Sequence, residues 1–266
     1  MTDSYIKKVR LYQILNTIGF IVTIIVNGLA NGIPLNGKTT GEISDSYPDL
    51  FAPAGITFAI WGVIYAGLGL FILYQLGFLS KDKKEYLEFV SRIGWSFVIA
   101  SIANSLWIIA WHYDKIGISV LIMLILLISL IDIYEKVNKN KASSIIQKIA
   151  VQWVFSIYLS WISVATIANI TTFLVSINWN GFGIPPQIWT MLVILIATIL
   201  TLGFVFYKKD IPYALVTEWA FLGILIKHVT FFGGEYKGII IIAAFCMVII
   251  FGSILAIHRG KKAQRG

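Results

Sequence analysis

Aromatic and amide side chains recur at helical spacing in several long apolar segments of this chain. Three segments carry such a stripe, namely Phe58, Trp61 and Tyr65; Asn104, Trp107 and Trp111; and Tyr158, Trp161, Ala165 and Asn169. Residues three or four apart lie on one face of an α-helix. Aromatic walls with a few amides could stack on a flat, mostly apolar ligand and orient its polar edge. The first chemistry that the sequence indicates is therefore ligand binding.

The segments that carry these stripes must lie in lipid. Of the 266 residues, 58% are apolar and only 13% are charged, whereas about 25% are charged in a soluble domain. A chain with so little charge could not cover a water-facing surface, so lipid must solvate it. Its net charge of +8 does not indicate nucleic-acid binding, because the basic residues form short clusters between apolar runs, as in cytoplasmic loops. We predict an all-α integral membrane protein.

A transmembrane helix needs about 20 apolar residues. The sequence offers eight such spans, near residues 11–32, 54–79, 91–113, 116–135, 149–177, 187–208, 212–232 and 237–257. With the N-terminus inside, the inner segments hold sixteen lysines and arginines and the outer segments three, which are Lys38, Lys115 and Lys237. This asymmetry predicts a multi-pass protein of the cell membrane with both termini cytoplasmic.

The stripes also share a depth. From the helix rise, Trp61, Asn104, Trp107 and Asn169 lie about 9–13 Å below the outer ends of their spans. They would enclose a cavity beneath the polar outer segment 32–50, which reads as a loop. The alternative is that these residues serve helix packing and the interfacial aromatic belt.

Three motifs in this order resemble the tryptophan-rich sensory protein/translocator protein (TspO/MBR) family. Residues 51–65, FAPAGITFAIWGVIY, resemble its second-helix signature F-x-P-P-x-x-x-F-x-x-x-W-x-x-x-Y. Residues 103–107, ANSLW, are similar to its L-N-x-x-W, and residues 158–169, YLSWISVATIAN, to its Y-L-x-W-x-x-x-A-T-x-x-N. The resemblance covers about residues 11–177.

The resemblance implies a five-helix bundle over residues 1–177, followed by three additional spans and a basic tail over 178–266, packed as one body. It implies a hydrophobic ligand such as a porphyrin, a haem-related tetrapyrrole or a sterol, with no cofactor required. Family pocket residues match Trp61, Asn104, Trp161 and Ala165, with Phe58, Tyr65, Trp107 and Asn169 as neighbours. The protein would be a sensor, scavenger or translocator, and light-dependent porphyrin degradation is a minor enzymatic alternative.

Two departures from the family pattern matter. The second proline is Ala54, and the Phe58–Trp61 spacing is one residue short, which would rotate Trp61 by about 100° on an undistorted helix. The three additional spans could cover the face through which short members dimerise, so a homodimer remains an open alternative.

Charged side chains in the seventh span offer a different function. Charge inside a membrane is costly and points to function by default. Lys227 is close enough to the outer end to reach water, and Glu218 could pair with Lys208 or Lys209. The alternative is an ion-coupled secondary transporter of a small solute that uses Glu218 and the last three spans. The three histidines form no ligand pair, and we predict no metal site.

Overall fold

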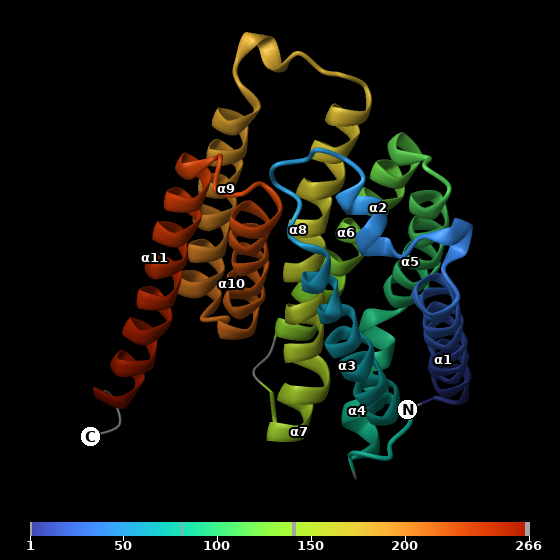
Figure 1. Ribbon diagram of the computed structural model, residues 1–266. Coiled ribbons are helices and arrows are strands. Elements are labelled where there is room, and N and C mark those ends of the chain that lie inside the picture. Colours follow the sequence, from blue (N-terminus) through green and yellow to red (C-terminus); the bar gives the residue numbers. More distant parts are fainter. Residues whose placement is uncertain (1, 81, 140–141, 264–266) are drawn as a thin grey trace. The chain divides into compact units, whose positions relative to one another are not determined.

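The computed structural model describes residues 2–80, 82–139 and 142–263 (Figure 1). Three basic residues used for the orientation, Lys81, Lys141 and Arg265, lie outside the described residues. The described chain is helical and contains no strand. Its elements are α1 (Asp3–Gly32), η1 (Leu35–Gly37), α2 (Thr40–Asp45), η2 (Gly55–Ala59), α3 (Ile60–Gln75), α4 (Lys83–Ile93), α5 (Ser96–His112), α6 (Ile116–Asn138), α7 (Ile145–Gln147), η3 (Lys148–Trp153), α8 (Val154–Ser176), η4 (Gly181–Gly183), α9 (Pro186–Gly203), η5 (Phe204–Lys208), α10 (Ile211–Ile226), η6 (Lys227–Phe231) and α11 (Lys237–Ala263).

The predicted spans are confirmed. Seven helical segments of the described chain are long and apolar enough to cross a membrane, and the pair α4–α5, bent by 56°, makes up to eight. The bend falls at Gly94, whose φ of +58° is a conformation that favours glycine. Side chains such as Ile199, Ile241 and Val248 are between 68% and 71% exposed. Apolar surface of this extent is stable only against lipid.

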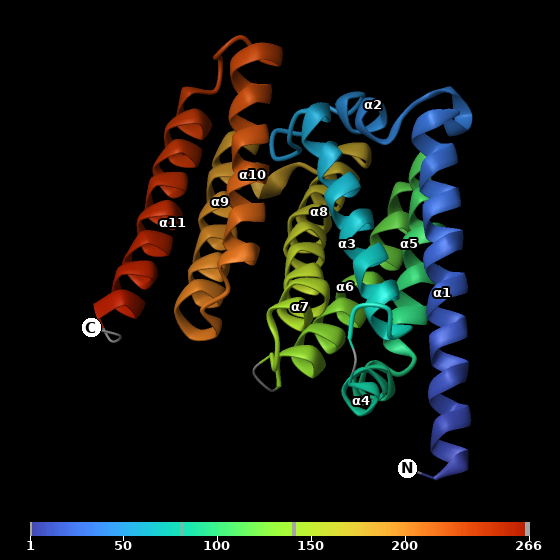
Figure 2. The same ribbon diagram turned by 90° about the horizontal axis from the view of Figure 1, so that it is seen from below.

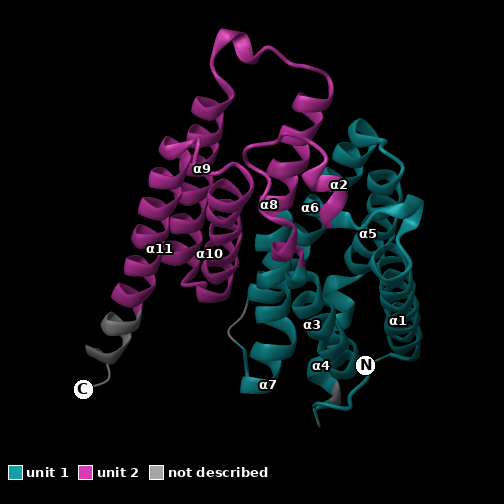
Figure 3. Cartoon of the chain, viewed as in Figure 1, with its two compact units in different colours: residues 1–40, 59–162 teal, residues 41–58, 163–266 magenta. Residues whose placement is uncertain are grey.

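The chain divides into two compact units, which are coloured separately in Figure 3. Unit 1 comprises residues 1–40 and 59–162, and unit 2 comprises residues 41–58 and 163–266. The boundary expected at residue 177 therefore lies within unit 2. The polar outer segment is divided between the units, and so is the long helix α8.

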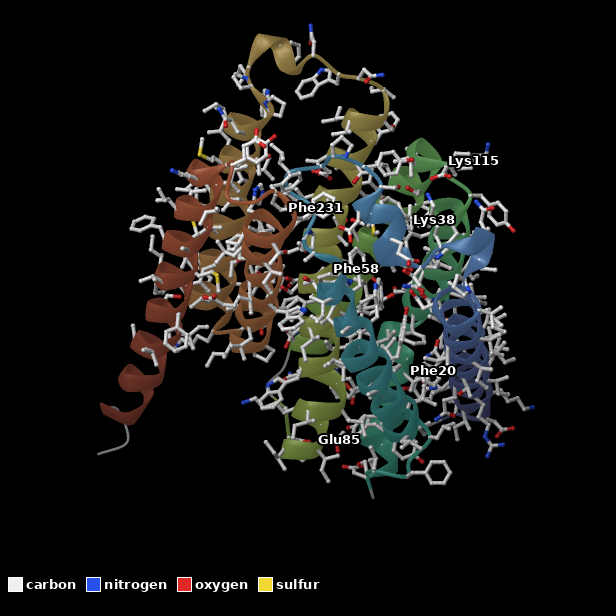
Figure 4. The ribbon with its side chains drawn as sticks, viewed as in Figure 1. Phe20, Lys38, Phe58, Glu85, Lys115 and Phe231 are labelled. Carbon is white, nitrogen blue, oxygen red and sulfur yellow. The ribbon has the colours of Figure 1, made fainter. Side chains whose placement is uncertain are left out.

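Unit 1 is built around the hairpin of α5 and α6, with α1 beside α5. A buried amide pair joins α1 to α3, because Asn16 Nδ2 donates to Gln75 Oε1 at 2.9 Å. Lys38 and Lys115 lie toward one end of this unit, whereas Glu85, at the start of α4, lies at the other (Figure 4). The two ends agree with the predicted assignment of these segments to opposite sides of the membrane.

Unit 2 contains α9, α10 and α11, which pack against one another (Figure 2). A buried hydrogen bond of 3.0 Å between the hydroxyls of Thr201 and Thr217 joins the end of α9 to α10. Pro186 and Pro212 stand in the first turns of α9 and α10, where a proline removes no helical hydrogen bond. Segment 41–58 belongs to this unit. It includes α2 from its second residue on, and this helix forms within the segment that was expected to be loop.

Candidate functional site

Five of the sequence-predicted residues gather in unit 1 around Trp61. Its indole stacks on Tyr65 at 5.4 Å between ring centroids and lies 6.0 Å from Trp107 and 6.3 Å from Trp161. A fourth ring, that of Tyr158, lies 6.0 Å away at an interplanar angle of 72°. The rings come from α3, α5 and α8. Residues from all three stripes therefore meet within this unit, and we call these five rings, with Asn104, the aromatic cluster.

The backbone that precedes Trp61 is not an undistorted α-helix. The 3₁₀ turn η2 precedes α3, which begins only at Ile60. A 3₁₀ turn has 3.0 residues per turn rather than 3.6, so the rotation expected from the short Phe58–Trp61 spacing does not apply. Trp61 is 7% exposed and faces the cluster.

Asn104 is fully buried and its amide is already used within unit 1. Its Oδ1 accepts a hydrogen bond of 2.8 Å from Asn27 Nδ2, and its Nδ2 donates to Tyr158 Oη at 2.9 Å. Asn27, on α1, is a partner that the sequence analysis did not identify. The structure makes Asn104 the centre of a polar network, because a buried amide in an apolar bundle requires partners.

One polar atom of the cluster has no such partner. Trp61 Nε1 is buried and makes no hydrogen bond to the described residues. An indole N–H can only donate, and leaving it unsatisfied in a buried site costs about 1–3 kcal/mol. A ligand with an acceptor oxygen or nitrogen at this point would recover that cost.

The other three predicted residues belong to unit 2. Phe58 lies in η2 and is half-buried (Figure 4). Ala165 is half-buried and Asn169 is buried, both on α8. These three residues are not brought together with the aromatic cluster within one unit.

Segment 41–58 is held to unit 2 by a series of specific contacts that the sequence analysis missed. Ala54 N donates to Gly223 O at 3.1 Å, and Trp219 Nε1 donates to Thr57 O at 2.9 Å. The approach requires glycine, because a Cβ at position 223 would lie 2.1 Å from Thr57 Oγ1. Gly223 is the only glycine of the predicted seventh span, and a single glycine in an apolar run gives no signal of this contact.

Asp49 is the most buried acid of this segment, with 2% exposure. Its Oδ2 accepts from the hydroxyls of Thr171 at 2.7 Å and Thr172 at 2.9 Å, and its Oδ1 accepts from Phe51 N at 2.9 Å. Burial raises the pKa of Asp49 above its ordinary value, although the three hydrogen bonds and the charge of Lys227 oppose the rise.

The expectation that Lys227 reaches water was wrong. Its side chain is 1% exposed, and its Nζ lies 3.2 Å from Asp45 Oδ1. The carboxylate of Asp45, in segment 41–58, is a partner that no pattern in the sequence predicts near Lys227. The next residue, His228, is also buried, and its Nε2 lies 2.9 Å from Leu50 O. A carbonyl can only accept, so Nε2 carries the proton.

Glu218 lies on α10 and is half-buried. Its Oε1 is buried and has no hydrogen-bond partner among the described residues. Among the residues that the structure describes, no group of three or more histidine, cysteine or acidic side chains could hold a metal ion.

Seven helical segments of the described chain that are long and apolar enough to cross a membrane, or eight with the bent pair α4–α5, define a multi-pass membrane protein. Residues 13–256 match the protein family described as TSPO-like protein, so the chain belongs to that family. The match extends through the last three spans, beyond the motifs within residues 11–177. No curated protein and no solved structure matches the chain.

Proposed function

We propose that the protein binds a flat, mostly apolar ligand of the porphyrin, haem-related or sterol type at the aromatic cluster of unit 1, acting as sensor, scavenger or translocator. The observation that supports this most is the buried Nε1 of Trp61, which lacks an acceptor while its ring is surrounded by four others. A ligand that offers an acceptor and a π-face would complement both features.

A ligand that binds in the aromatic cluster must separate rings that already contact one another. The rings contact one another, so a ligand would replace ring–ring contacts with ring–ligand contacts. Each aromatic pair is worth about 0.5–1.5 kcal/mol beyond burial, so affinity depends on the ligand stacking on more than one ring. Asn104 would act mainly by holding Asn27 and Tyr158, because its own amide is already bonded.

The test is to titrate the purified protein in detergent with a porphyrin and to measure binding by the quenching of tryptophan fluorescence. We expect saturable binding, weakened by about two- to tenfold in Trp61→Phe, which loses the N–H, and in Trp161→Phe. Asn104→Ala should also weaken binding. Trp95→Phe is the matched control, because Trp95 is 51% exposed and lies outside the cluster.

Non-saturable quenching, or equal affinity in the wild type and the cluster variants, would mean that the rings only pack the bundle. Illumination of the bound porphyrin separates the enzymatic alternative, which predicts light-dependent loss of porphyrin absorbance that fails in Trp161→Phe. The transporter alternative predicts solute flux coupled to an ion gradient, abolished in Glu218→Gln.

A further inference from the structure

Unit 2 contains a cavity of about 590 Å³ that shares none of the predicted ligand residues. It lies between α8, the 179–184 turn, α9 and residues 48–50. This volume is within the range of about 300–1,000 Å³ found for small-molecule sites. The residues that α8 contributes include Ile167 and Thr171, which are two positions from Ala165 and Asn169. Two residues are about 200° of rotation on a helix, so the cavity uses the opposite face of α8.

The wall of the cavity is mostly apolar, with two indoles and one acid. Trp179 and Trp189 lie 5.5 Å apart between ring centroids, and Trp189 Nε1 donates to Gly181 O at 2.9 Å, which fixes one ring against the turn. Asp49 also lines the cavity, together with Thr171, to which its carboxylate is hydrogen bonded. Indole faces and carboxylates both attract cations.

The charges around Asp49 leave a place for a cation. The ammonium of Lys227 lies against Asp45 at 3.2 Å, and the adjacent His228 has its proton directed to Leu50 O. The three hydrogen-bond donors to Asp49 are neutral, namely two hydroxyls and one backbone N–H. A carboxylate has about four acceptor positions, so one remains beside Oδ1. The group of Asp45, Asp49 and Lys227 therefore carries two negative charges and one positive charge.

We propose that this cavity is a second binding site, specific for hydrophobic cations, in which Asp49 supplies the counter-charge and Trp179 and Trp189 the aromatic contacts. The site goes beyond the porphyrin site and uses residues of the other unit. Protonation of Asp49 would remove the attraction. Since burial raises the pKa of Asp49, affinity should fall as the pH is lowered toward 3.8.

The experiment compares two probes of nearly equal size and opposite charge, tetraphenylphosphonium and tetraphenylborate, with triphenylphosphine oxide as a neutral relative. Binding of each to the purified full chain is measured by equilibrium dialysis. We expect saturable binding of the phosphonium ion and at least about tenfold weaker binding of the other two. Asp49→Asn should weaken phosphonium binding by about tenfold or more, and Trp189→Phe by about two- to fivefold.

Two further variants keep the test independent of folding defects at Asp49. Val193→Trp fills the cavity without changing charge and should abolish saturable binding, whereas Glu235→Gln removes an exposed acid of the same unit and should leave it unchanged. Equal affinity for the cation and the neutral probe, or unchanged affinity in both Asp49→Asn and Val193→Trp, would overturn the proposal and make the cavity a crevice for lipid chains. Trp61→Phe should not alter phosphonium binding, so the two proposed sites can fail separately.

Discussion

The ammonium of Lys227 lies 3.2 Å from the carboxylate of Asp45, although these residues are 182 positions apart in the sequence. Lys227 begins the π-helical end of the seventh span, and Asp45 ends the short helix between the first two spans. The pair shows how unit 2 holds residues 41–58, with further contacts at Asp49, Ala54 and Thr57. Residues of α8, α10 and η6 thus hold a segment that lies between the first two spans in the sequence.

Removing one member of this pair should cost stability. Asp45→Asn leaves the ammonium of Lys227 buried without its ion-pair partner. Breaking a fully buried pair costs about 3–5 kcal/mol, and the partial exposure of Asp45, 35%, reduces this to about 1–3 kcal/mol. We expect a lower Tm in detergent, measured by circular dichroism.

The double variant Asp45→Asn/Lys227→Met should regain part of the loss, because no charge is then left unpaired. Lys237→Met, at an exposed lysine of the same unit, is the control and should change the Tm little. Additive effects of the two substitutions would show that the pair does not couple.

Gly223→Ala should destabilise the packing of segment 41–58 on α10. The added methyl group would meet Thr57 Oγ1 at 2.1 Å and Pro53 Cβ at 2.9 Å, and overpacking typically costs about 1–3 kcal/mol. Limited proteolysis within residues 41–58 and the Tm both report the effect. Gly252→Ala, in α11 with no atom within 4 Å of the new Cβ, should be neutral or stabilising by up to about 1 kcal/mol. Equal effects of the two substitutions would exclude close packing as the reason for glycine at 223.

The amide network of Asn104 predicts a graded response. Asn104→Ala breaks two buried hydrogen bonds, whereas Tyr158→Phe breaks one. Interhelical hydrogen bonds in membranes contribute about 0.6–1.7 kcal/mol, so the first variant should lose more stability to unfolding by dodecyl sulfate. Asn138→Ala, whose amide bonds only the preceding turn, serves as the control. A greater loss in Tyr158→Phe than in Asn104→Ala would contradict the network.

Asp49 should make the stability depend on pH in a defined direction. Burial raises its pKa in the folded protein above the ordinary value of 3.8, so the folded state binds this proton more tightly than the unfolded state. Burying the ionised carboxylate therefore lowers the stability of the fold fully above the raised pKa, and this loss of stability is relieved as the pH falls through the raised pKa toward 3.8. The difference in Tm between the wild type and Asp49→Asn should change in favour of the wild type as the pH is lowered. A difference that is constant from pH 8 to pH 4 would contradict this assignment.

The sequence by itself determined the class of fold and the position of every span. In lipid a run of about 20 apolar residues satisfies its backbone hydrogen bonds as a helix. Seven of the eight predicted segments are candidate helical spans, and the third becomes one when the bent pair α4–α5 is counted as a single span. Helical spacing also identified the stripes of Trp61, Trp107 and Trp161, because residues three and four apart share a face whatever that face contacts.

The tertiary structure alone decided what those faces contact. Three sets of contacts join residues that are 77 to 182 positions apart. They are the hydrogen bond from Asn27 to Asn104, the ion pair of Lys227 and Asp45, and the hydrogen bonds of Asp49 with Thr171 and Thr172. Helical periodicity extends only over a few turns and contains no information about partners on other helices. The same limit explains why a lysine expected to reach water is buried and why the cavity between α8 and α9 left no motif in the chain.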